Sequence, residues 1–137
     1  MENYIASIKP DVVGFKIYST DLLSAKRGLA IAKEIDPSII TIIGGPHPSC
    51  ITPQEVMDYF SETDFAFKGE AEIGLPLLID ELPRPKPIKM RNIPGLIYRD
   101  NEKAIANAPI FVEDLFRGVT NKTFIFQTTY EMYTLTL

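Results

Sequence analysis

Residues 41–50 read TIIGGPHPSC, an apolar run that ends in two glycines and is followed by the only histidine of the chain. The apolar residues 39–43 are typical of a strand buried on both faces, as in a parallel sheet. Gly44 and Gly45 carry no Cβ, so a flat ligand can approach the backbone closely there. Taken alone, a glycine pair before Pro46 is more often a tight turn. The stretch therefore predicts a buried strand whose end is either a turn or a binding loop.

Strands alternate with helices on both sides of this stretch. Apolar residues at helical spacing predict helices, and apolar runs rich in β-formers predict strands. The expected helices cover residues 1–9, 22–36, 53–60 and 73–81, and the expected strands cover residues 11–18, 39–43 and 64–67. Thr52 and Glu55 have the spacing of a capping box, and residues 19–21 offer oxygens for another helix N-cap. The alternation predicts a three-layer α/β fold, with a parallel sheet between two layers of helices.

The composition changes after residue 82. Residues 83–89, PRPKPIK, contain three prolines and read as a stiff linker. Residues 90–115 contain two short apolar runs around the turn DNEK, which is the pattern of a β-hairpin. The atypical tail, residues 116–137, alternates well enough for one or two more strands. We therefore expect a domain at 1–82, a linker at 83–89, a hairpin extension at 90–115 and a β tail.

The overall composition excludes several classes of protein. A chain of 137 residues with 45% hydrophobic residues corresponds to about one globular domain. The net charge of −4 argues against nucleic acid as a partner, and there is no apolar run long enough for a membrane span. The single cysteine, Cys50, allows no internal disulfide and no iron–sulfur cluster held by this chain alone. Together with an N-terminus unlike a signal peptide, it indicates a cytoplasmic protein.

Three unusual loops follow the three expected strands. By the topology of a parallel sheet, we expect these loops to lie along one edge. Because ligands in open α/β sheets bind beyond the carboxyl ends of the strands, we expect the loops to form a ligand site. The candidate residues are Ser19 and Thr20, then Gly44, Gly45, Pro46 and His47, then Gly69, Glu70 and Glu72.

The polar residues of these loops also have simpler interpretations. His47 and Cys50 are too few to make a metal site, so we expect no metal there. Glu70 and Glu72 alternate as on an extended segment and should point in opposite directions. One of them is expected to interact with the dipole of the helix that follows. No residue of the chain is expected to be catalytic.

The motifs taken together resemble a known family. The segments PDVVGFKIYST, AKRGLAIAKEIDPSIITIIGGPHPS, TPQEV, DFAFKGEAE and IPGLIYRDN are similar to the cobalamin-binding N-terminal domain of B12-dependent radical SAM enzymes, over residues 1–115. The resemblance implies that Ser19 and Thr20 contact the lower side of cobalamin and that Gly44 and Gly45 let its nucleotide tail lie against the backbone. The third loop matches the family pattern G-E-G-E, with Ala71 in place of the second glycine.

The resemblance also implies parts that this sequence does not contain. The family fold is flavodoxin-like, with five strands in the order 2-1-3-4-5, and its first two strands would precede Met1. The cobalt-ligating D-x-H-x-x-G loop has no counterpart here, and the iron–sulfur cluster and SAM would belong to a radical SAM domain downstream. Without the first two strands, the strand at residues 11–18 is left with an open edge. The tail could fold back over that edge or cross to a second copy, so we expect a homodimer.

Two functions follow from this comparison. The first is a cobalamin-binding module of a radical SAM enzyme, for methyl transfer or oxidative cyclase-type chemistry, with no activity alone. The second is a non-catalytic dimerisation or interaction domain that has lost cobalamin binding. A receiver-like or flavin-binding domain of the same topology ranks last, because Ser19, Gly44 and Gly69 stand where a receiver needs acidic residues.

Overall fold

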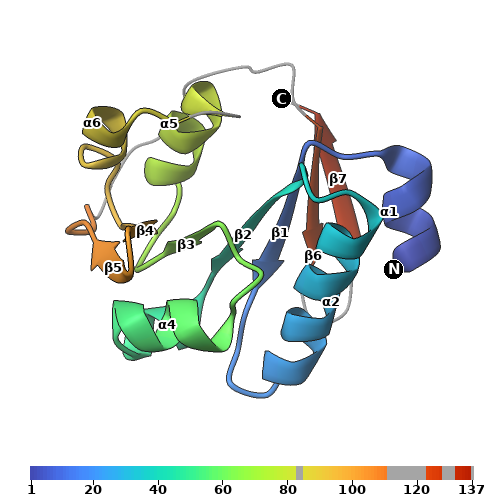
Figure 1. The fold of residues 1–137 in the computed structure, drawn as a ribbon, viewed down its shortest axis with the longest axis horizontal. Coiled ribbons are helices and arrows are strands. Elements are labelled where there is room, and N and C mark those ends of the chain that lie inside the picture. The colour runs from blue at the N-terminus through green and yellow to red at the C-terminus, as the bar shows by residue number, and fades with distance from the viewer. Residues whose placement is uncertain (83–84, 111–122, 128–131, 137) are drawn as a thin grey trace.

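The structure is a computed structural model that describes residues 1–82, 85–110, 123–127 and 132–136. Its helices are α1 (Glu2–Ile8), α2 (Leu22–Ile35), α3 (Pro46–Cys50), α4 (Pro53–Tyr59), α5 (Gly74–Glu81) and α6 (Pro87–Met90). Its strands are β1 (Val12–Lys16), β2 (Ile40–Gly44), β3 (Phe65–Phe67), β4 (Leu96–Asp100), β5 (Lys103–Ala106), β6 (Thr123–Gln127) and β7 (Met132–Thr136). Within the described residues these strands form one sheet in the order β5-β4-β3-β2-β1-β6-β7 (Figure 1).

The centre of the sheet is parallel, as the alternation of strands and helices predicts. β1 runs parallel to β2, with Val12 opposite Ile40, and β2 runs parallel to β3, with Ile42 opposite Phe65. The three central strands lie where the apolar runs place them, and each is buried because helices cover the sheet on both sides. The predicted flavodoxin-like α/β fold is confirmed.

Side chains that alternate along the central strands divide the core into two halves. Val13 and Ile43 belong to the half that packs against α1, α2 and α4. Val12 and Ile42 belong to the other half, which packs against α5. Figure 1 shows α5 and α6 on one side of the sheet and α1, α2 and α4 on the other. The three predicted layers are therefore present, and the loops that join them emerge at the two ends of the strands.

The hairpin continues the sheet beyond the proline-rich segment. β4 pairs antiparallel with β3, and β4 with β5. The guanidinium group of Arg99 in β4 donates hydrogen bonds to the carbonyl oxygens of Met57 and Ser61, at 2.8 and 3.3 Å, and also to that of Thr63. These bonds satisfy one carbonyl group in the last turn of α4 and two in the segment that follows the helix. The hairpin is thus joined to the domain through its core and through this cap.

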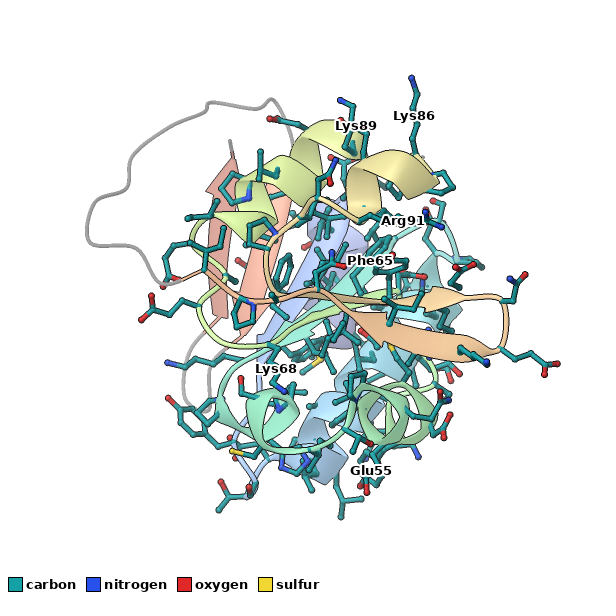
Figure 2. The ribbon with its side chains drawn as sticks, turned by 90° about the vertical axis from the view of Figure 1, so that its left-hand side faces the viewer. Glu55, Phe65, Lys68, Lys86, Lys89 and Arg91 are labelled. Carbon is teal, nitrogen blue, oxygen red and sulfur yellow. The ribbon has the colours of Figure 1, made fainter. Side chains whose placement is uncertain are left out.

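The proline-rich segment contains a helix where we expected a linker at residues 83–89. Its last residues form the start of α6, and Lys89 makes an ion pair with Glu81 of α5 at 2.7 Å. Figure 2 shows Lys86 and Lys89 extending outward from α6, whereas Phe65 lies inside, between this helix layer and the sheet. Residues 83–84 of the expected linker lie outside the described residues.

The tail supplies the strand that the open edge of β1 needs. β6 pairs parallel with β1, with Val12 opposite Phe124, and β7 pairs antiparallel with β6. If β3, β2 and β1 are taken as the fifth, fourth and third strands of a flavodoxin-like sheet, β6 and β7 occupy the positions of its first and second strands. β7, however, runs antiparallel to β6. Of the two ways in which we expected the tail to cover this edge, the chain uses the fold-back. The homodimer stays a prediction, and the rest of the tail, at residues 116–122, 128–131 and 137, lies outside the described residues.

Two local predictions at helix starts have different outcomes. Thr52 and Glu55 form the predicted capping box, because the Thr52 side chain accepts from the Glu55 N–H and the Glu55 carboxylate accepts from the Thr52 N–H. The predicted side-chain cap at residues 19–21 is wrong. Asp21 occupies the N-cap position of α2 without a side-chain hydrogen bond to the helix, and the Thr20 hydroxyl donates to the Asp21 carboxylate instead, at 3.1 Å.

Candidate functional site

The three loops that follow β1, β2 and β3 meet at the edge of the sheet formed by the carboxyl ends of these strands, which we call the carboxyl edge. The N–H of Ile17 donates to the carbonyl of Gly44 at 2.8 Å, and the N–H of His47 donates to the carbonyl of Ile17 at 3.2 Å. The N–H of Gly69 donates to the hydroxyl of Ser49 at 2.9 Å. These bonds join the first loop to the second and the second to the third. The carboxyl ends of the parallel strands therefore form one continuous surface, where open α/β sheets bind ligands.

A cavity of about 470 Å³ lies at this edge, between the loops and the start of α5. Its size is in the range of small-molecule sites. Six of the predicted site residues line it: Gly44, Gly45, Pro46, Gly69, Glu70 and Glu72. Ser19, Thr20 and His47 are not among the lining residues of this cavity, although they lie in the loops beside it.

The two glycines after β2 have different structural roles. Gly45 has a φ of +104°, and a Cβ there would lie 3.0 Å from both the backbone N and the backbone O of Ile17. This residue makes the turn, since other residues rarely adopt such a φ. Gly44 has no such constraint, because a Cβ there would meet only the Cβ of Phe67, at 3.9 Å. Its missing side chain leaves the cavity open, so the pair is a turn and a binding surface at once.

The third loop also depends on one glycine. Gly69 has a φ of +76°, and a Cβ there would lie 3.1 Å from the Cβ of Pro109. Ala71, which replaces the second glycine of the family pattern, is not among the residues of positive φ. The loop conformation of this chain therefore does not require glycine at that position.

The charged residues at the cavity lie on the loop after β3 and at the end of β1. Glu70 and Glu72 both line the cavity, although their alternation predicts opposite directions. α5 starts at Gly74 with no side-chain cap and no acidic residue in its first turn, so neither glutamate caps it. Lys16 also lines the cavity. Its pKa is raised above the usual value, first by a hydrogen bond and charge attraction with Tyr18 and then by the charge of Glu72, so this lysine supplies a positive charge at neutral pH.

His47 lies in the short helix α3 rather than in the loop that its two neighbouring prolines predict. A proline at the first helical position is already in the helical φ range, so Pro46 starts a helix here. The Nδ1 atom of His47 lies 3.2 Å from the hydroxyl oxygen of Ser19, which links the second loop to the first. In the part of the chain that the structure describes, there is no group of three or more His, Cys, Asp or Glu residues that could hold a metal ion.

Nine lining residues are missing from the sequence-based set: Gly14, Phe15, Lys16, Ile42, Ile43, Ser49, Phe67, Ala71 and Leu75. Gly14 had a detectable signal, because a single glycine inside an apolar strand often marks a close approach to the backbone. Ser49 had none, since its role depends on hydrogen bonds between loops that lie far apart in the sequence.

A second cavity, of about 580 Å³, lies at the amino ends of the parallel strands. It is lined by Pro10, Asp11 and Val12 before and at the start of β1, by Ile39 and Ile40 near the start of β2, and by Leu82 after α5. This cavity is the larger one, but it lies at the amino ends of the strands. Because the carboxyl ends are where this fold class binds its ligands, we take the smaller cavity, of about 470 Å³, as the candidate site and call it the carboxyl-edge cavity.

Two kinds of comparison relate the chain to known proteins. The family described as B12 binding domain matches residues 1–79. The anaerobic magnesium-protoporphyrin IX monomethyl ester cyclase of Rubrivivax gelatinosus is 31% identical over 116 residues, which cover 82% of this chain and 21% of that protein. An uncharacterized methyltransferase of Pyrococcus horikoshii is 31% identical over 105 residues, which cover 77% of this chain and 22% of that protein. The chain thus spans about a fifth of the length of these relatives. Among its described residues, none of the helices has the length and apolar character to cross a bilayer.

Proposed function

Because the chain belongs to the B12-binding domain family, we propose that its carboxyl-edge cavity takes part of a cobalamin molecule and that the chain is the cobalamin-binding module of a radical SAM enzyme. The observation that carries the proposal is the open space above Gly44. A side chain at that position would occupy the cavity, and glycine keeps the backbone within reach of a flat group.

The residues around the cavity fit such a ligand in shape. Gly44, Gly45 and Gly69 offer backbone without side chains, and Phe67 and Leu75 offer apolar walls. At about 470 Å³ the cavity is large enough for the nucleotide tail of cobalamin rather than for the whole molecule.

The remaining candidate residues have roles that follow from their position and charge. Lys16 also lines the cavity and brings a positive charge to it, which suits the phosphate group of the nucleotide tail. Ser19, Thr20 and His47, which do not line the cavity, would contact the part of the ligand that lies outside it, and Pro46 would contact the part inside. Glu70 and Glu72 would border it on the third loop.

The chemistry of the whole enzyme is that of its cofactors, and this chain positions one of them. Bound cobalamin would supply a cobalt centre for methyl transfer or for an oxidative cyclase-type step, the reaction types that the names of the two relatives suggest. The iron–sulfur cluster and SAM would be held by a separate radical SAM domain. We expect no activity from this chain alone, and a cytoplasmic location.

A spectral titration with hydroxocobalamin tests the proposal. The wild-type chain should shift the visible spectrum of the ligand and co-elute with it in gel filtration. Gly44→Val should weaken binding by about tenfold or more, because the added methyl groups enter the cavity. Ala6→Val is the matched control, since it adds comparable bulk at the second cavity. Absence of a shift with wild type, or equal affinity of the two variants, would refute the proposal.

The second candidate, a non-catalytic interaction domain, is favoured by one observation. β6 occupies the place beside β1 where a flavodoxin-like sheet has its first strand. In classical members of the family the loop after that strand carries the cobalt-ligating motif, which has no counterpart in this sequence. On this alternative the chain forms a homodimer and does not bind cobalamin. Light scattering that gives twice the mass of 15.4 kDa, together with an unchanged hydroxocobalamin spectrum, would favour it.

A further inference from the structure

Ser49 joins the second loop to the third through its side chain. Its hydroxyl donates a hydrogen bond to the carbonyl of Gly45 and accepts one from the N–H of Gly69, both at 2.9 Å. A serine hydroxyl has one donor and two acceptor positions. Its single donor is used for Gly45 in the second loop, and one acceptor position is used for Gly69 in the third loop.

Both partners of Ser49 are glycines in the left-handed region of φ. Gly45 has a φ of +104° and Gly69 a φ of +76°, and both line the carboxyl-edge cavity. Glycine loses more conformational freedom on folding than any other residue. Side-chain hydrogen bonds to such positions therefore select one conformation from many that the backbone could adopt.

The place of Ser49 in the fold makes it suited to this role. It lies on α3, whose His47 N–H is bonded to the carbonyl of Ile17 in the first loop. One turn of helix thus carries a bond to each neighbouring loop. The loop after β3 is joined to the rest of the edge by the Ser49 hydroxyl, and the side chain itself lines the cavity.

We propose that Ser49 is a positioning residue, which fixes the separation of the second and third loops and thereby the affinity of the cavity for its ligand. The part that concerns affinity rests on the proposed function. The part that concerns the loops rests on the two hydrogen bonds alone, and the two parts are measured separately.

The first measurement is amide hydrogen exchange at Gly69. Loss of the acceptor in Ser49→Ala should speed this exchange by about tenfold, the effect of about one hydrogen bond. Ser49→Thr keeps the hydroxyl and should restore the wild-type rate. The matched control is Ser38→Ala, which removes a hydroxyl bonded at 2.6 Å to the Asp36 carboxylate at the other edge of the sheet. It should leave the Gly69 rate unchanged.

The second measurement is the affinity for hydroxocobalamin of the same three variants. Ser49→Ala should bind several-fold to about tenfold more weakly, whereas Ser49→Thr and Ser38→Ala should bind as the wild type does. Thermal melts of each variant separate this effect from a general loss of stability, which would also move exchange in the core strands.

Two results would overturn the proposal. One is an unchanged Gly69 rate in Ser49→Ala. The other is faster exchange with unchanged affinity, which would mean that the two loops are joined without any effect on the cavity. If the wild-type chain binds no hydroxocobalamin, the proposed function fails, and the positioning role is then decided by the exchange of Gly69 alone.

Discussion

Replacing Gly74 with alanine tests how closely α5 packs against the sheet. Gly74 is the first residue of α5, directly after the third loop of the candidate site. A Cβ at this position would lie 2.3 Å from the carbonyl oxygen of Pro94 and 2.5 Å from a ring carbon of Phe67. Contacts below 3.0 Å do not occur for real Cβ atoms, so the helix and the Pro94 backbone would have to separate by about 0.7 Å, the difference between 3.0 and 2.3 Å.

The expected cost follows from this overlap. Overpacking of a closed core costs about 1–3 kcal/mol, and the higher helix propensity of alanine offsets at most about 1 kcal/mol. We expect Gly74→Ala to lower the free energy of unfolding by about 2 kcal/mol, which lowers the Tm by roughly 6–8 °C for a domain of this size. Leu75 moves with the helix, so the cavity that it lines should also change shape.

Urea unfolding followed by far-UV circular dichroism measures the effect, since the chain has no tryptophan. The matched control is Gly44→Ala, whose Cβ would meet only the Cβ of Phe67 at 3.9 Å. It should unfold within about 0.5 kcal/mol of the wild type. If Gly74→Ala has the same midpoint as the control, the close packing of α5 described here is wrong.

Two further predictions concern the capping box and the tail. The pKa of Glu55 lies below its usual value of 4.5, because its carboxylate accepts hydrogen bonds from the Thr52 hydroxyl and then from the Thr52 backbone N–H. The stabilisation is therefore complete above the unfolded pKa and disappears as the pH falls through the folded one. Glu55→Gln should be less stable than wild type at neutral pH, and the difference should shrink below pH 4.5 in urea titrations; a pH-independent difference would contradict this. Deleting residues 116–137 removes the strand that pairs with β1, so light scattering should detect larger species than it does for the wild-type chain; a deletion variant that forms no larger species would count against the pairing.

Much of the fold was predictable because it is encoded by local periodicity. The apolar run at residues 39–43 became β2 (Ile40–Gly44), and the capping box spacing marked the start of α4. Strand ends were less exact for a physical reason. Residues 17 and 18 continue the apolar run of β1 but lie beyond its end, where the Ile17 N–H and carbonyl are bonded to Gly44 and His47.

The short helices and the strand neighbours were not predictable in the same way. α3 and α6 have only 5 and 4 residues, so they show no helical periodicity, and their prolines resemble those of loops. The alternation of the tail predicts strands but not their partners, because pairing depends on contacts distant in sequence. The meeting of the predicted loops at one end of the sheet follows from the parallel topology, whereas the bridging role of Ser49 depends on hydrogen bonds between loops distant in sequence.

The pairing of β1 with β6 has a consequence for how the protein is made. The paired residues Val12 and Phe124 are more than 100 positions apart, so this ladder closes a very long chain segment and should form late in folding. On the ribosome, β1, β2 and β3 emerge before β6 and can assemble with their helices, while the edge of β1 stays unpaired until residues 123–127 have been translated. Nascent chains are therefore most prone to aggregate after β1 has emerged and before β6 has, and a chaperone that shields a single strand edge would act in that interval.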